Sequence, residues 1–326
     1  MKHWIFLALF ALGLLHAVYS SLPILDPSSS LFNNDEGYFL NNGLNAIILS
    51  DLRYGLFSLL VKSYFLVVGD PFWVVVFHKS LLLTFFFLLQ LLLVREYGYK
   101  VFILLYSSFI FLNGFFLRES LIFLFVLLAL YFSNTGRSTG NYVSLIGLAL
   151  TRPQGLMLFL RPWVSLLILL TFLLFLRPQY AVVQVPDNGF LTLINGEFWK
   201  FVFAKVLTTL ANLNPLASFM FHSAEGDYLQ LIVSILGSIA MFVVFAQMVL
   251  ASGWRQYRHA YLFKLCSGMI FLLVIYGAIG MAADKRIFLS LFSPFVIFIN
   301  PSFLQLRNLF LLLVVWIFML IIGVFL

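Results

Sequence analysis

The chain has 326 residues, of which 63% are hydrophobic and only 10% are charged, and its mean hydropathy is +1.07. A soluble domain contains about 25% charged residues, so this composition excludes an ordinary soluble protein. It predicts an all-α, polytopic transmembrane helix bundle with roughly eight to ten spans. The net charge of +7 does not indicate nucleic-acid binding, because the basic residues are scattered between apolar segments and fit contact with membrane lipid.

The chain begins with an apolar segment from Trp4 to Val18. We expect an uncleaved helix with a cytoplasmic N-terminus, since many apolar segments follow it. Residues 21–70 then form a long outer loop with mixed composition. Within this loop, residues 38–52 and 54–68 are too short or too interrupted to span a bilayer, so we expect interfacial helices there.

The middle of the chain alternates apolar segments with short polar ones. Residues 72–94 are predicted to run inward, residues 101–116 outward and residues 121–132 inward again, because basic residues mark the cytoplasmic ends. Residues 142–161 are interrupted by Arg152 and Pro153 and are expected to form a bent or re-entrant hairpin. If Arg152 lies deep it needs a partner, whereas in a re-entrant hairpin it lies near the cytoplasm.

The whole chain is predicted to be a single transmembrane domain. Residues 1–176 form an N-terminal module, residues 177–228 an outer loop with interfacial helices, and residues 229–326 the C-terminal spans. This topology leaves several basic residues on the outer face, against the usual preference for the inner one. These exceptions are Arg118, Arg177, Lys200, Lys205, Lys285 and Arg286.

Charged residues gather at the predicted outer ends of the spans. Three clusters are expected to converge there: Asp35 with Glu36, Arg118 with Glu119, and Asp284 with Lys285 and Arg286. A carboxylate can take a proton from an attacking hydroxyl, and an arginine can neutralise a phosphate leaving group. The alternative interpretation is that these charges pair with one another at the headgroup level.

Three further residues are candidates for substrate contact. His78 and Lys79 lie inside a predicted span, where ionisable residues are functional candidates by default. Lys79 could instead extend its side chain outward to the interface. Tyr38 follows the acidic pair and could border a sugar or prenyl group.

The order of these motifs resembles the GT-C superfamily of integral-membrane glycosyltransferases, which includes protein O-mannosyltransferases and lipid A aminoarabinose transferases. In that family an acidic motif opens the long first outer loop, a short outer turn carries an arginine and a second acid, and a Gly-x-Ala stretch leads to a basic residue. The matching motifs are Asp35-Glu36-Gly37-Tyr38, Arg118-Glu119 and Gly147-Leu148-Ala149-Leu150-Thr151-Arg152-Pro153. The resemblance covers residues 1 to about 160.

The resemblance implies a sugar donor carried on a polyprenyl phosphate or diphosphate, and a glycan, lipid or protein hydroxyl as acceptor. Asp35 or Glu36 would be the general base, with Asp35 favoured, and Glu119 would orient the acceptor or assist the base. The substrate-binding residues would be Arg118, Tyr38, His78, Lys79, Lys285 and Arg286, with Arg286 on the departing phosphate.

No metal cluster is evident, although some relatives use a divalent cation at the acidic motif, and Asp35 with Glu36 could ligate one. The expected location is a bacterial inner or plasma membrane, with the active site facing the periplasm. The chain length and the outer arginines also fit a polysaccharide polymerase of the Wzy kind. A flippase for a lipid-linked glycan and a non-catalytic assembly subunit are further alternatives, although no internal repeat typical of transporters is visible.

Overall fold

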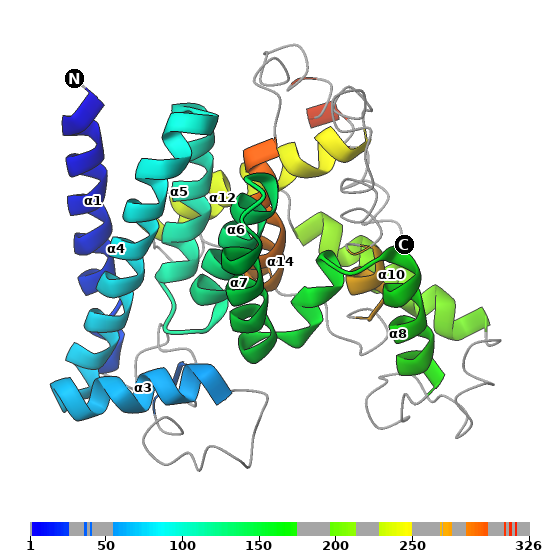
Figure 1. Ribbon diagram of the computed structural model, residues 1–326, viewed down its shortest axis with the longest axis horizontal. Coiled ribbons are helices and arrows are strands. Elements are labelled where there is room, and N and C mark those ends of the chain that lie inside the picture. Colours follow the sequence, from blue (N-terminus) through cyan, green and yellow to red (C-terminus); the bar gives the residue numbers. More distant parts are fainter. Residues whose placement is uncertain are drawn as a thin grey trace.

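The computed structural model consists of α-helices and short 3-10 helices, and none of the residues that it describes forms a strand (Figure 1). The predicted all-α fold is therefore confirmed. The structure describes residues 2–25, 36–37, 40, 55–174, 196–212, 228–249, 268, 270–275, 285–298, 310, 313–314 and 317.

Within the residues that the structure describes, two helical segments are long and apolar enough to cross a membrane, judged by length and composition. The first, Trp4–Leu25, comprises α1 (Lys2–Tyr19) and the short helix η1 (Leu22–Leu25). The second, Pro71–Arg95, lies within α4 (Pro71–Tyr97). The other apolar helices of the described chain are shorter, so a bundle of eight to ten spans stays a prediction.

The ends of α4 follow from local sequence. The Asp70 side chain accepts a hydrogen bond from the backbone N–H of Trp73 at 3.1 Å, and Pro71 occupies the first helical position. Both residues are typical of a helix start. At the other end, Gly98 has a φ of 85°, a conformation that side chains disfavour. This glycine lets the chain reverse directly into α5 (Tyr99–Asn113).

Helix α3 (Gly55–Val68) runs across the end of the bundle, whereas α1, α4 and α5 run along it (Figure 1). Its buried residues are Phe57, Val61 and Tyr64, which recur at helical spacing and face the bundle, while Leu66 and Val67 are exposed. The helix predicted at residues 54–68 is thus confirmed, while its position in the membrane interface stays a prediction. The companion stretch 38–52 lies outside the described residues, apart from Leu40.

Aromatic rings form the core between α4, α5 and α6 (Glu119–Asn134). Phe86 stacks on Phe109 with ring centroids 4.4 Å apart, and Phe109 meets Phe123 at 5.7 Å. Such pairs stabilise beyond their buried area. The core therefore fixes the short turn that joins α5 to α6, residues 114–118, which we call the 114–118 turn.

Helix α7 (Ser138–Thr151) packs closely against α6. Gly147 makes this approach possible, because a Cβ atom there would come within 2.3 Å of the Phe125 ring. The helix ends at Arg152, and Pro153–Leu158 follow as the 3-10 helix η2. The predicted interruption at Arg152 and Pro153 is thus present, and it comes after α7 has run back along α6.

Replacing Gly147 by Val is expected to lower the free energy of unfolding by about 2 kcal/mol, because the added methyl groups overpack the contact with Phe125. Thermal unfolding in detergent measures this effect. Gly196→Val is the matched control, since nothing lies within 4 Å of a Cβ atom at Gly196. Adding Phe125→Ala to Gly147→Val should recover part of the loss, and equal melting of Gly147→Val and wild type would contradict the packing argument.

The rest of the described chain continues the helical pattern. Its elements are α8 (Pro162–Leu174), α10 (Gly196–Asn212), α12 (Tyr228–Val249), α14 (Lys285–Phe292) and the 3-10 helix η4 (Ser293–Phe298). Helix α12 packs along α5, and α14 packs against α5 and α6. The contact with α14 brings the C-terminal half of the chain to the 114–118 turn.

Candidate functional site

The 114–118 turn is where segments distant in sequence meet. Its backbone N–H at Phe116 donates a short hydrogen bond to Oε1 of Glu36, a residue 80 positions earlier. Glu36 is buried, with an exposed fraction of 8%. A carboxylate is costly to desolvate unless it is hydrogen-bonded, so this bond holds the acidic motif against the turn. Asp35 and Tyr38 lie outside the described residues.

Lys79 is fully buried beneath the same turn. Its Nζ donates to the backbone oxygen of Gly114 at 2.6 Å, and to the backbone oxygen and Oγ of Ser20 at 3.0 Å each. Ser20 and Gly114 follow the C-terminal ends of α1 and α5, where helix carbonyls are left unsatisfied and partial charge is negative. The ammonium group also interacts electrostatically with Glu36.

These contacts assign Lys79 a different place from the one predicted. An ammonium group has three donor hydrogens, and three acceptors surround it here. A further hydrogen bond joins α4 to α5, because Nδ2 of Asn113 donates to the backbone oxygen of Lys79 at 2.9 Å. Lys79 therefore joins α1, α4 and α5 instead of extending outward, and it retains no donor for a substrate.

His78 is enclosed by aromatic rings. Its ring lies 5.4 Å from Phe57, 5.5 Å from Tyr64 and 5.3 Å from Phe116, measured between centroids. The side chain is fully buried, and neither ring nitrogen has a hydrogen-bond partner among the described residues. Direct substrate contact by His78 would require these rings to separate.

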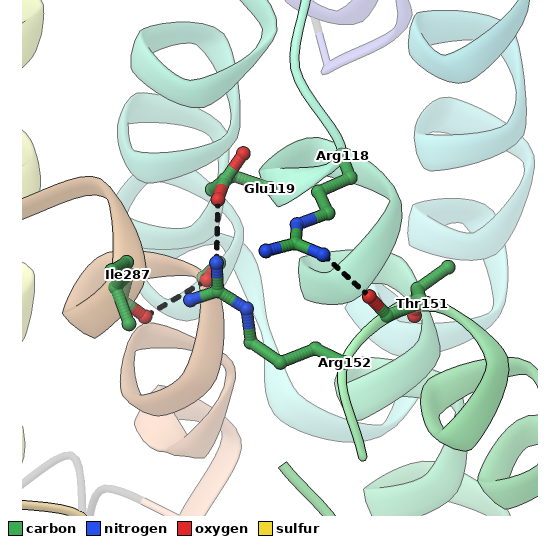
Figure 2. A network of polar contacts seen from close by, with 6 residues as sticks. Arg118, Glu119, Thr151, Arg152 and Ile287 are labelled. Atoms are coloured by element: carbon green, nitrogen blue, oxygen red, sulfur yellow. Dashed lines mark hydrogen bonds and ion pairs between the residues drawn. The ribbon is translucent and has the colours of Figure 1, made fainter. Parts of the chain in front are cut away.

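A second polar network joins α6 to the end of α7 (Figure 2). Nη2 of Arg152 donates to Oε1 of Glu119 at 3.0 Å, and the two side chains are only 5% and 9% exposed. Nη1 of Arg118 donates to the backbone oxygen of Thr151 at 3.3 Å. Arg152 therefore has a carboxylate partner and is buried within the helix packing, while its depth in the membrane stays a prediction.

Arg286 reaches the 114–118 turn from α14. Its guanidinium carbon lies 5.2 Å from the centroid of the Phe115 ring, within the range of a cation–π interaction. Lys285 begins α14, but its side chain and the whole of Asp284 lie outside the described residues. Members of all three charged clusters, namely Glu36, Arg118 with Glu119, and Arg286, therefore lie at or against one turn.

The described side chains at this turn carry more positive than negative charge. The cations are Lys79, Arg118, Arg152 and Arg286, whereas the carboxylates are Glu36 and Glu119. Such an excess raises the local concentration of anions. Lys79 is fully buried, whereas Arg118 and Arg286 are only partly buried.

The Glu36 carboxylate, one half of the acidic pair considered as a cation ligand, is already engaged at one oxygen, and Asp35 lies outside the described residues. Oε1 of Glu36 accepts the Phe116 N–H, and the Lys79 ammonium group already supplies positive charge beside it. In the part of the chain that the structure describes, no group of three or more His, Cys, Asp or Glu residues could hold a metal ion.

A hollow of about 260 Å³ lies between α1 and α4, away from these charges. Its lining is apolar, with Phe6, Phe10 and Phe87 among its residues. Such a surface suits a lipid chain better than a sugar.

Sequence reasoning missed several parts of this site. It did not pair Arg152 with Glu119, and it did not identify Ser20 and Gly114 as acceptors for Lys79. The pairing of Arg152 with Glu119 could have been recognised from helix lengths. Helices α6 and α7 have 16 and 14 residues, so an antiparallel hairpin of two nearly equal helices brings Glu119 level with Arg152.

Comparison of the chain with models of protein families, with curated proteins and with solved structures finds no match.

Proposed function

We propose that this chain is an integral-membrane glycosyltransferase, which moves a sugar from a polyprenyl-phosphate or polyprenyl-diphosphate donor to a hydroxyl acceptor on the outer face of the membrane. The observation that carries this proposal is the gathering of Glu36, Glu119, Arg118 and Arg286 at the 114–118 turn. Carboxylates and guanidinium groups at one place suit a substrate that carries hydroxyls and a phosphate. The motif order that resembles the GT-C superfamily supports the same function.

The contacts of Glu36 favour its neighbour in sequence, Asp35, as the base. Glu36 is buried, hydrogen-bonded to the turn and beside an ammonium group, so its carboxylate is already engaged in holding the acidic motif in place. Glu36 is therefore the anchor of the acidic motif, and Asp35, its neighbour in sequence, is the proton acceptor.

In the proposed reaction the acceptor oxygen forms a bond to the anomeric carbon of the sugar, and its proton passes to the Asp35 carboxylate. The bond between the anomeric carbon and the phosphate oxygen breaks, and its electron pair leaves with the phosphate. Arg286 and Arg118 neutralise the leaving group, since guanidinium binds phosphate oxygens strongly. Glu119 accepts a hydrogen bond from the acceptor sugar or protein and so orients it.

Glycan profiling of cells tests the proposal. Cells that produce Asp35→Asn, Glu36→Gln, Glu119→Gln or Arg286→Ala at normal protein levels are compared with wild type by mass spectrometry of their envelope glycans. Glu197→Gln is the control, because Glu197 is exposed and forms an ion pair with the exposed Lys200, away from the 114–118 turn. The expected result is loss of one sugar from the glycan in Asp35→Asn, Glu119→Gln and Arg286→Ala, a smaller loss in Glu36→Gln, and an unchanged glycan in the control.

Other outcomes separate the remaining candidates. Truncation of the glycan to a single repeat would indicate a polymerase that joins lipid-linked repeats. Accumulation of a complete lipid-linked glycan on the inner face would indicate a flippase. Unchanged glycans in all four site variants would remove the enzymatic hypothesis.

A further inference from the structure

The two oxygens of the Glu119 carboxylate lie in different environments. Oε1 accepts a hydrogen bond from Nη2 of Arg152 at 3.0 Å. Oε2 is buried and has no hydrogen-bond partner among the residues that the structure describes. A buried carboxylate oxygen without a partner is costly, and such groups are retained where a ligand or water completes them.

The backbone around Arg152 is arranged to hold this pair. Arg152 stands between the end of α7 and the 3-10 helix that starts at Pro153, with extended backbone angles of −153° and 90°. Proline cannot continue α7, so the chain turns at this point and the Arg152 side chain reaches α6 (Figure 2). The Arg118 contact to the Thr151 backbone oxygen fixes the same corner from the other side.

We infer that Arg152 is the positioning residue of Glu119: it fixes Oε1 so that Oε2 faces a hydroxyl of the acceptor. The inference rests on the proposed function, in which Glu119 orients the acceptor, and it adds the residue that holds Glu119 in place. Arg152 itself touches no reacting atom. Its loss therefore acts through the orientation of the carboxylate, and a displacement of about 1 Å can reduce a rate by up to 100-fold.

A purely structural ion pair would predict different behaviour. Breaking a buried pair destabilises a protein strongly, whereas replacing both partners is often nearly neutral. A lysine at position 152 keeps the positive charge but loses the planar guanidinium geometry. If Arg152 sets the orientation of Glu119, Arg152→Lys should lose activity while it keeps its stability. If the pair only holds α6 to α7, stability and activity should change together in Arg152→Lys.

The test measures two quantities for each full-length variant: the melting temperature in detergent, and the rate at which radiolabelled sugar enters envelope glycan per molecule of protein. Arg152→Gln is expected to melt earlier and to incorporate label about 30-fold more slowly. Arg152→Lys is expected to melt close to wild type and to incorporate label about fivefold more slowly. Glu119→Gln with Arg152→Gln should regain most of the lost stability and none of the lost rate. Lys200→Gln, which breaks an exposed pair, is the control.

Each other result has a definite meaning. A wild-type rate in Arg152→Lys, in Arg152→Gln or in the double variant overturns the positioning role and leaves the proposed transferase in place. A wild-type rate in Glu119→Gln, with loss in Asp35→Asn, overturns this inference and the role of Glu119 in orienting the acceptor, and leaves a transferase with Asp35 as its base. Label incorporation that does not depend on the protein at all overturns the proposed function and the inference with it.

Discussion

Replacing Lys79 by Met is expected to lower the free energy of unfolding by about 3 kcal/mol. The substitution preserves the apolar stem but removes three hydrogen bonds, two of them to buried backbone oxygens of Ser20 and Gly114. It also removes the positive charge beside the buried Glu36. Thermal unfolding in detergent measures the loss, and Lys62→Met is the matched control, because Lys62 is an exposed lysine on the neighbouring helix α3.

A double variant separates the two contributions. Lys79→Met with Glu36→Gln should recover part of the stability, because it removes the uncompensated carboxylate that the single variant leaves buried. The carbonyls of Ser20 and Gly114 remain without their donor, so recovery should be incomplete. If Lys79→Met melted like Lys62→Met, Lys79 would not join the three helices as described.

Replacing Asp35 by Asn is expected to slow sugar transfer by about 1,000-fold without changing the melting temperature, because asparagine cannot accept the acceptor's proton. Glu36→Gln is the matched variant, since it makes the same change one residue along the chain. It is expected to lower the melting temperature, because it removes the charge that faces Lys79, and to slow transfer far less. Incorporation of labelled sugar and thermal unfolding, measured on the same preparations, check both expectations.

The opposite pattern would exchange the two roles. If Glu36→Gln abolished transfer at full stability while Asp35→Asn remained active, Glu36 would be the base and its hydrogen bond to Phe116 would open during turnover. Equal activity of both variants and wild type would remove the acidic motif from the chemistry.

Much of the helical layout could be predicted from the sequence. A long apolar run between a capping aspartate and a glycine is enough to place α4, and the predicted span 72–94 lies inside it. The amphipathic spacing of Phe57, Val61 and Tyr64 similarly predicts that α3 lies on a surface. These features depend on neighbours in sequence, which is why they can be recognised without coordinates.

The partners of the buried charges could not be predicted in the same way. Lys79 donates hydrogen bonds to backbone oxygens. Because every residue has a backbone oxygen, the sequence does not indicate which residues will accept these bonds. The ion pair between Glu119 and Arg152 depends on the close packing of α6 and α7, which Gly147 permits. The expectation that Glu36 and Arg286 approach the same place required only the order and direction of the helices, and both residues do lie against the 114–118 turn.

The dependence of two buried charges on the 114–118 turn has a consequence for the order of events during synthesis. Translation delivers Glu36 and Lys79 well before Gly114 and Phe116, and the N-terminal part of a chain generally folds first. Lys79 can meet Ser20 as soon as α4 follows α1, but its third acceptor and the Glu36 donor emerge together when the end of α5 leaves the ribosome. The nascent chain thus lacks one hydrogen-bond partner for each of these two charges until a single short segment supplies both.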